Sequence, residues 1–204
     1  MAGWTRADGP AVGLPLENVD TDQLIPARFM SAPRAEGYGR FLLHDLRRDE
    51  GGAPNPACPL EAAGAEGAAI LVARRNFGSG SSREAAVYAL VDAGFRAVLA
   101  PSFGDIFAAN AANNGLVAGR IAPEAAEAML AALAAGPAQA SLDIEAREAA
   151  VAGLTARFEI DPAAALKIAN GWDDIDLTAS RRGEIGRFRE ARRREAPWAW
   201  PSDA

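Results

Sequence analysis

Cysteine and histidine are almost absent from this sequence, which contains one of each in 204 residues. Cys58 cannot form an intrachain disulfide, nor can it supply the several thiolates that a structural zinc site or an iron–sulfur cluster requires. A histidine-based triad or a thiol redox pair would have to be built on His44 or Cys58 alone. Most common catalytic arrangements are therefore excluded, and we expect no metal ligands in this chain.

Positive charge and long apolar runs are also scarce. Twenty-one Lys and Arg face 27 Asp and Glu, which gives a net charge of −6. This balance repels nucleic acids and anionic membrane surfaces. No segment approaches the roughly 20 apolar residues of a membrane helix, and the first 30 residues lack the apolar region of a signal peptide. We expect no nucleic-acid or membrane partner, and a cytoplasmic protein is the simplest interpretation.

The hydrophobic share of 50% is enough to build a folded core. The length predicts a single domain over 1–204, with a helical, arginine-rich tail at about 181–204. Apolar runs of strand length, each followed by a helical pattern, are typical of βαβ units and a parallel sheet. The predicted strands are 11–16, 68–73 and 96–101, the predicted helices are 82–93, 102–115 and one starting at Pro123, and short antiparallel strands are expected within 141–160.

A glycine-serine loop at 76–86, NFGSGSSREAA, is the most informative segment. It lies between a predicted buried strand and a predicted helix. Gly78 and Gly80 permit backbone conformations closed to other residues and let backbone amides approach a ligand. The segment lacks the Gly-Lys-Ser/Thr ending of a P-loop and the third glycine of a dinucleotide fingerprint, so nucleotide binding is disfavoured.

Ser81, Ser82 and Arg83 are expected at the N-terminus of the helix that follows this loop. Unpaired N–H groups and the positive end of the helix dipole attract anions there, and an arginine can hold a carboxylate through two hydrogen bonds. The residues thus predict a carboxylate or phosphate site. The alternative is structural, because Ser81 with Glu84 matches a capping box that would only start the helix.

Three segments together resemble a known family. They are NVDTDQLIPARF at 18–29, NFGSGSSREAAVYAL at 76–90 and GFRAVLAPSFGDIFAANAANNGL at 94–116. In this order and spacing they are similar to the 3-isopropylmalate dehydratase small subunits, the swivelling domain of the aconitase superfamily. The resemblance covers about residues 11–178 and extends weakly to NGWDDIDLT at 170–178.

This resemblance implies a β/β/α swivelling domain, an α/β fold with a mixed sheet whose parallel core is flanked by helices. It implies a hydro-lyase that converts 2-isopropylmalate to 3-isopropylmalate through isopropylmaleate in leucine biosynthesis. A [4Fe–4S] cluster is expected in a separate large subunit, in a heterodimer or heterotetramer, with no cofactor on this chain. One cysteine here agrees with that division.

The resemblance also suggests roles for individual residues. Ser81 corresponds to the base that removes a proton next to a carboxylate, Arg83 to a ligand of the substrate carboxylate, and Ser82 to an assisting residue. Arg28 and Phe29 open a loop that would contact the variable group of a substituted malate.

Residues outside the serine-arginine triplet have weaker assignments. Thr21 and Asp22 would shape the mouth of the site, although an Asx turn with a purely structural role is the alternative. Arg47 is a candidate second carboxylate ligand, with a solvated surface arginine as the alternative. The arginine-rich tail is expected to be a solvated amphipathic helix, with docking to the large subunit as the other interpretation.

The sequence departs from the family at several positions. Ala85 stands where the family usually has a histidine, and GLVAG at 115–119 and AALKIANGWDDI at 164–175 are also altered. Two alternatives therefore stay open beside the leucine enzyme. One is the small subunit of a paralogue acting on another substituted malate, of the methylmalate or homoaconitate type, and the other is a non-catalytic assembly module.

Overall fold

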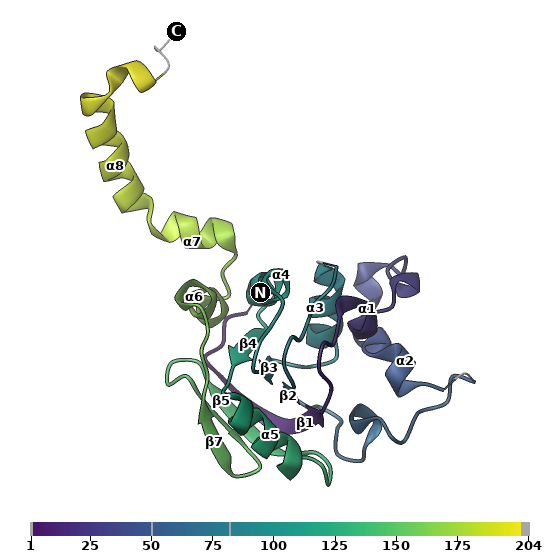
Figure 1. The fold of residues 1–204 in the computed structure, drawn as a ribbon. Coiled ribbons are helices and arrows are strands. Elements are labelled where there is room, and N and C mark those ends of the chain that lie inside the picture. The colour runs from purple at the N-terminus through teal and green to yellow at the C-terminus, as the bar shows by residue number, and fades with distance from the viewer. Residues whose placement is uncertain (1, 50, 82, 201–204) are drawn as a thin grey trace.

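A computed structural model describes residues 2–49, 51–81 and 83–200 of the chain (Figure 1). In this part of the chain, strands alternate with helices as the sequence predicts. The strands are β1 (Arg6–Leu14), β2 (Ile70–Ala73), β3 (Ala97–Ala100), β4 (Val117–Arg120), β5 (Ala138–Asp143), β6 (Glu148–Val151) and β7 (Leu154–Arg157). The α-helices are α1 (Thr21–Leu24), α2 (His44–Arg47), α3 (Glu84–Asp92), α4 (Asp105–Asn113), α5 (Pro123–Ala132), α6 (Pro162–Asn170), α7 (Asp174–Ser180) and α8 (Arg182–Glu195).

The described strands form one sheet in the order β4-β3-β2-β1-β5-β6-β7. Strands β1 to β4 are parallel, and β5 to β7 continue from β1 as antiparallel neighbours. The predicted mixed sheet with a parallel core is confirmed. Strand β1 is longer than the predicted 11–16 because its first half, Arg6–Ala11, pairs with β5, a long-range pairing that the local pattern does not encode.

The parallel strands are buried on both faces. In β2, Leu71 and Ala73 point into one core cluster while Ile70 and Val72 point into the other. Helices α3 and α4 pack on the first face and α5 on the second, as Figure 1 shows. Burial on both sides explains why β2 and β3 read as continuous apolar runs in the sequence.

Both helices that follow the inner strands start differently from the sequence pattern. Helix α3 has Arg83 at its N-cap without a side-chain cap, so the expected capping box of Ser81 and Glu84 is not formed. Helix α4 starts after Gly104 and not at the predicted residue 102, and the Ser102 hydroxyl accepts a hydrogen bond from the Asn76 N–H at 2.8 Å. Ser102 therefore joins two loops rather than starting a helix.

The C-terminal helices α7 and α8 extend away from the body of the molecule (Figure 1). Helix α8 contains no buried residue, and a short 3-10 turn at Pro197–Ala199 follows it. None of the described helices has the length and apolar character that crossing a bilayer demands.

Candidate active site

Three loops meet at the carboxyl ends of the parallel strands. Val19 O, in the loop after β1, accepts a hydrogen bond from the Gly78 N–H in the loop after β2, at 2.7 Å. The loop after β2 also joins the loop after β3, because the Phe77 N–H donates to Ser102 O at 3.0 Å. Ligand sites of open α/β sheets lie at this edge.

Gly78 lets the loops approach one another this closely. Its φ of +71° lies in the left-handed region, and a Cβ atom there would overlap the ring of Phe107. Beneath it, Phe77 packs edge-on against Phe107 at 5.4 Å between ring centroids, and Phe103 stacks on Phe107 at 6.2 Å. The aromatic rings form a rigid floor under the loop.

The backbone of Ser81 is held by Thr21. Thr21 is 2% exposed, and its hydroxyl donates to the carbonyl oxygen of Ser81 at 2.5 Å. The N–H of Arg83 donates to the same oxygen at 2.7 Å. The turn that carries Thr21 is itself fixed, because Asp20 forms a capping box with Gln23 at the start of α1. Thr21 thus positions the loop while Ser81 stays exposed.

Arg83 lies beside Asp22, and the two side chains form an ion pair. The arginine is half-buried and the aspartate is exposed. A guanidinium has five N–H donors, and the ion pair is made through Nη1. Ser81, Arg83, Thr21, Asp22 and the two loop glycines therefore gather in one place, whereas Ser82 lies outside the described residues.

Arg28 and Phe29 lie in the 3-10 turn after α1, against α2. The Arg28 guanidinium pairs with Asp45 and covers the ring of Phe29 at 4.6 Å. The hydrogen bond from Arg28 holds the pKa of the Asp45 carboxyl below its ordinary value. Phe29 stacks on Phe41 at 4.4 Å. The pair forms a surface that is partly apolar and partly charged.

The side chain of Arg47 forms an ion pair within the fold. Its Nε donates to Glu61 at 2.5 Å, and Arg48 reaches the other oxygen of the same carboxylate at 3.2 Å. Arg47 and Glu61 are both largely shielded from solvent. The Arg47 guanidinium thus ties α2 to the segment around Glu61 and faces a carboxylate of its own chain.

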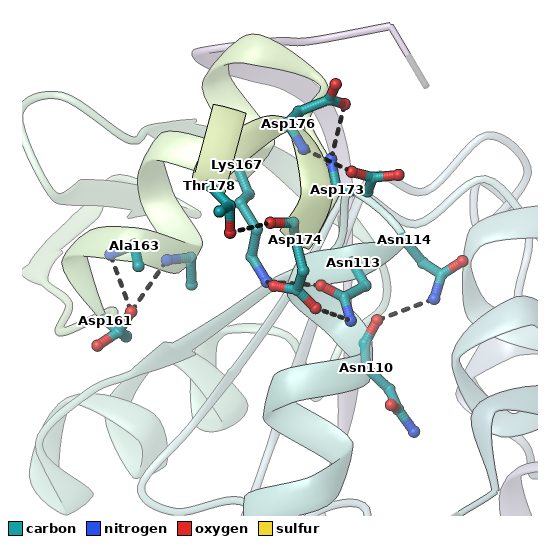
Figure 2. A network of polar contacts seen from close by, with 11 residues as sticks. Asn110, Asn113, Asn114, Asp161, Ala163, Lys167, Asp173, Asp174, Asp176 and Thr178 are labelled. Atoms are coloured by element: carbon teal, nitrogen blue, oxygen red, sulfur yellow. Dashed lines mark hydrogen bonds and ion pairs between the residues drawn. The ribbon is translucent and has the colours of Figure 1, made fainter. Parts of the chain in front are cut away.

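A polar network beside the site was missed by sequence reasoning. The amide of Asn114, at the end of α4, donates to the carboxylate of Glu84, the residue after Arg83, at 2.9 Å. The neighbouring Asn113 accepts from Lys167 Nζ at 2.6 Å, and Lys167 also reaches Asp174 at 2.7 Å (Figure 2). The sequence pattern gives no sign of this network, because a lysine in an amphipathic helix is typical of a solvated face.

The residues of this chain do not suit a [4Fe–4S] cluster. Such a cluster takes several cysteine thiolates, and the chain has only Cys58, a free cysteine in a buried position. Burial raises the pKa of the Cys58 thiol and disfavours the thiolate that binds metal. Within 2–49, 51–81 and 83–200, no group of three or more His, Cys, Asp or Glu could hold a metal ion.

Comparison with known proteins agrees with this fold and loop arrangement. The family described as the aconitase C-terminal domain matches residues 1–124. A crystal structure of 3-isopropylmalate dehydratase from Methanocaldococcus jannaschii superposes with a TM-score of 0.64 at 24% identity, over 89% of this chain and 98% of that one. This structural likeness supports the fold, and the class defined is that of aconitase-type swivelling domains.

Curated relatives narrow the class. A 3-isopropylmalate dehydratase small subunit of Rhodospirillum centenum is 40% identical over 98% of this chain and 99% of its own. Others from Anaeromyxobacter sp. and Shouchella clausii are 44% and 40% identical over 89% and 88% of this chain and 94% and 91% of their own. The chain belongs to the family of 3-isopropylmalate dehydratase small subunits, so it is part of a hydro-lyase that works with a large subunit.

Gly78→Ala tests the close approach of the loops. We expect it to lower the free energy of unfolding by about 1 to 3 kcal/mol more than Gly153→Ala, because overpacking adds to the backbone term. Gly153 is the matched control, since its φ is also positive, at +83°, but no atom lies within 4 Å of its Cβ position. Urea unfolding measures both. Equal losses would mean that Phe107 yields without cost.

The pH dependence of stability tests the ion pair that Asp174 forms in the polar network. The hydrogen bond from Lys167 holds its pKa below the ordinary value of 3.8, so the carboxylate contributes stability that is present above this pH and lost as pH falls through the folded pKa. The stability difference between the wild type and Asp174→Asn is expected to be largest near pH 7 and to shrink below about pH 4. Urea unfolding at several pH values measures it; a constant difference would contradict the ion pair.

Proposed function

We propose that this chain is the small subunit of a cytoplasmic dehydratase that interconverts 2-isopropylmalate and 3-isopropylmalate in leucine biosynthesis. The observation that carries the proposal is the loop of Ser81 and Arg83, held by Thr21 and Asp22 at the carboxyl edge of the parallel strands. Membership of the dehydratase small-subunit family supplies the reaction. The free cysteine suits a reducing compartment.

Ser81 is the proposed base. The C–H bond next to a substrate carboxylate breaks, its proton passes to Ser81 Oγ, and its electron pair forms the C=C bond as hydroxide leaves the neighbouring carbon. Addition of water in the opposite sense then yields the other isomer. A serine acts as a base only as the alkoxide, and the N-terminus of α3 together with Arg83 provides the positive charge that stabilises it.

Arg83 is the proposed ligand of the substrate carboxylate. Its Nη1 is engaged by Asp22, so the remaining donors of the fork can receive a carboxylate in a fixed orientation. Asp22 is then a positioning residue, as is Thr21. Ser82 would assist through its backbone amide or hydroxyl, and Gly78 and Gly80 give the loop its shape.

Arg28 and Phe29 are proposed to contact the alkyl branch of the malate. Their surface offers an aromatic ring for the branch and a guanidinium whose charge Asp45 already balances. Arg47 was a candidate carboxylate ligand, but its pairing with Glu61 favours a supporting role behind this surface.

The large subunit is proposed to hold the iron–sulfur cluster and to form the other wall of the site. The cluster supplies Lewis-acid chemistry where it is bound. This chain contributes the base, the carboxylate ligand and the surface for the branch.

A related substrate is the second candidate, and Ala85 is the observation that favours it. Ala85 is 8% exposed and packs in the core cluster under α3. A methyl group in this core cluster replaces the histidine usual in the family, so the contribution of that imidazole to the substrate surroundings is absent. A paralogue acting on methylmalate or a homoaconitate-type acid would fit this change.

Reconstitution with the large subunit tests the proposal. The purified chain is combined anaerobically with a cluster-loaded large subunit, and dehydration is assayed on 2-isopropylmalate, methylmalate and malate. Ser81→Ala is expected to lower kcat by a factor of about 10² to 10⁴, as loss of a general base does. Ser79→Ala, in the same loop, is the matched control and should retain turnover.

The outcomes separate the candidates. Highest kcat/KM for isopropylmalate supports the leucine enzyme, and preference for another malate assigns the chain to a paralogue. A tight complex that turns over none of the acids would leave only an assembly module. Retained turnover in Ser81→Ala would remove this serine from the role of base.

Asp22→Asn tests the orientation of Arg83. We expect kcat/KM to fall by about tenfold, mainly through KM, because the guanidinium loses its fixed position before the substrate arrives. Steady-state kinetics of the reconstituted pair measures it, with Asp49→Asn as a control at an exposed aspartate in the 48–54 turn. A lower KM would instead show that Asp22 competes with the substrate for Arg83.

A further inference from the structure

Residues 174–199, comprising α7, α8 and the final turn, form an arm that leaves the body of the molecule (Figure 1). We propose that this arm is a docking element for the large subunit. The arm binds an acidic surface of that subunit, and an apolar side chain of the large subunit inserts between α7 and α8. The proposal rests on the proposed function, because it takes the dehydratase large subunit as the occupant.

Apolar side chains of the arm face solvent. Ile185 is 41% and Phe188 68% exposed, and their spacing of three residues places them on the same side of α8. With Leu177 of α7 they line a shallow groove of about 440 Å³, whose other lining residues are Thr178, Arg181 and Glu184. A groove that combines exposed apolar side chains with polar ones is suited to a protein interface.

Charge on the arm differs from that of the rest of the chain. Residues 181–195 carry seven arginines and three glutamates, while the whole chain has a net charge of −6. The rest of the chain is therefore strongly acidic. A basic, apolar arm on an acidic body is suited to a separate acidic partner, which the arm attracts while the body does not compete for it.

A chain of side-chain contacts connects the base of the arm to the catalytic loop. Asp174 starts α7 and contacts Lys167 and Asn113 (Figure 2). Asn114, the residue after Asn113, donates to Glu84, which directly follows Arg83. These contacts run across the end of α4, so a subunit that covers Ser81 and extends past α4 reaches the base of the arm. The arm continues the interface that the reaction requires.

Lys167 fixes the direction in which the arm leaves. It is 8% exposed, and its ammonium donates to Asn113 Oδ1 and Asp174 Oδ1. Burying an ammonium is costly unless it is paired, so this group resists movement of α7 away from α4 and α6. An arm with a fixed base loses less conformational freedom on docking.

Binding to the purified, cluster-loaded large subunit tests the arm. The full chain with Ile185→Ser and Phe188→Ser is compared with Leu154→Ser, an apolar residue of β7 that is 38% exposed and lies outside the arm. Sedimentation velocity and calorimetry give Kd, and turnover is followed as small subunit is added to a fixed amount of large subunit. Far-ultraviolet circular dichroism and urea unfolding check that each variant is folded.

We expect the double variant to raise Kd at least tenfold, with turnover recovered at saturating concentration, and Leu154→Ser to leave Kd within twofold of the wild type. Arg187→Glu with Arg189→Glu should raise Kd as well, and the wild-type Kd should rise with salt. Asp174→Ala, which loosens the base, should weaken binding less than removal of the apolar pair.

An unchanged Kd in folded arm variants would overturn the proposal. Loss of self-association in those variants, with large-subunit affinity intact, would overturn it too and assign the arm to contact between copies of this chain. Failure of the proposed function is distinct: arm-dependent complex formation without turnover of any malate would retain the docking arm and reject the reaction.

Discussion

One backbone carbonyl, that of Ser81, receives two hydrogen bonds on which the geometry of the site depends. The Thr21 hydroxyl and the Arg83 N–H both donate to it. The first bond joins loops sixty residues apart in the chain, and the second closes the turn that leads into α3. Because Thr21 is buried and its own turn is capped, the backbone of Ser81 is held in place beside the carboxyl ends of the parallel strands, and its side chain remains exposed to a ligand. Preorganisation of this kind reduces the reorganisation needed at the moment of reaction.

The parallel half of the sheet was predictable because the residues that specify each strand are neighbours in the sequence. Strands buried on both faces must be apolar at every position, and β2 and β3 show this directly in their sequences. The glycine-serine loop from Gly78 to Arg83 was found for the same reason, since glycines followed by a helix start are a short-range pattern, and its role as an anion site stays a prediction. The starts of α3 and α4 were not predicted correctly: Ser81 caps no helix, and Ser102 accepts from the backbone of another loop.

The sequence alone did not predict which side chains pair with one another across the fold. Nothing near Arg47 indicates that Glu61 takes its guanidinium, and nothing near Arg83 indicates Asp22, because these choices depend on which loops the sheet brings together. The same holds for Lys167, which reads as a surface residue of an amphipathic helix until α4 and α7 enclose it. The family resemblance supplied chemistry that spacing alone could not, and the proposed roles of Ser81 and Arg83 rest on it.

The ion pair of Arg83 and Asp22 also bears on which solutes the isolated subunit collects. An unpaired guanidinium at a helix N-terminus would attract any passing phosphate or carboxylate. With Asp22 in contact through Nη1, a monovalent anion instead meets a guanidinium whose charge is already largely balanced by a tethered carboxylate. A dicarboxylate whose second carboxylate binds elsewhere in the site gains an interaction that a monoanion cannot make. If Arg83 has the proposed role, we therefore expect the isolated subunit to bind dicarboxylates in preference to simple anions.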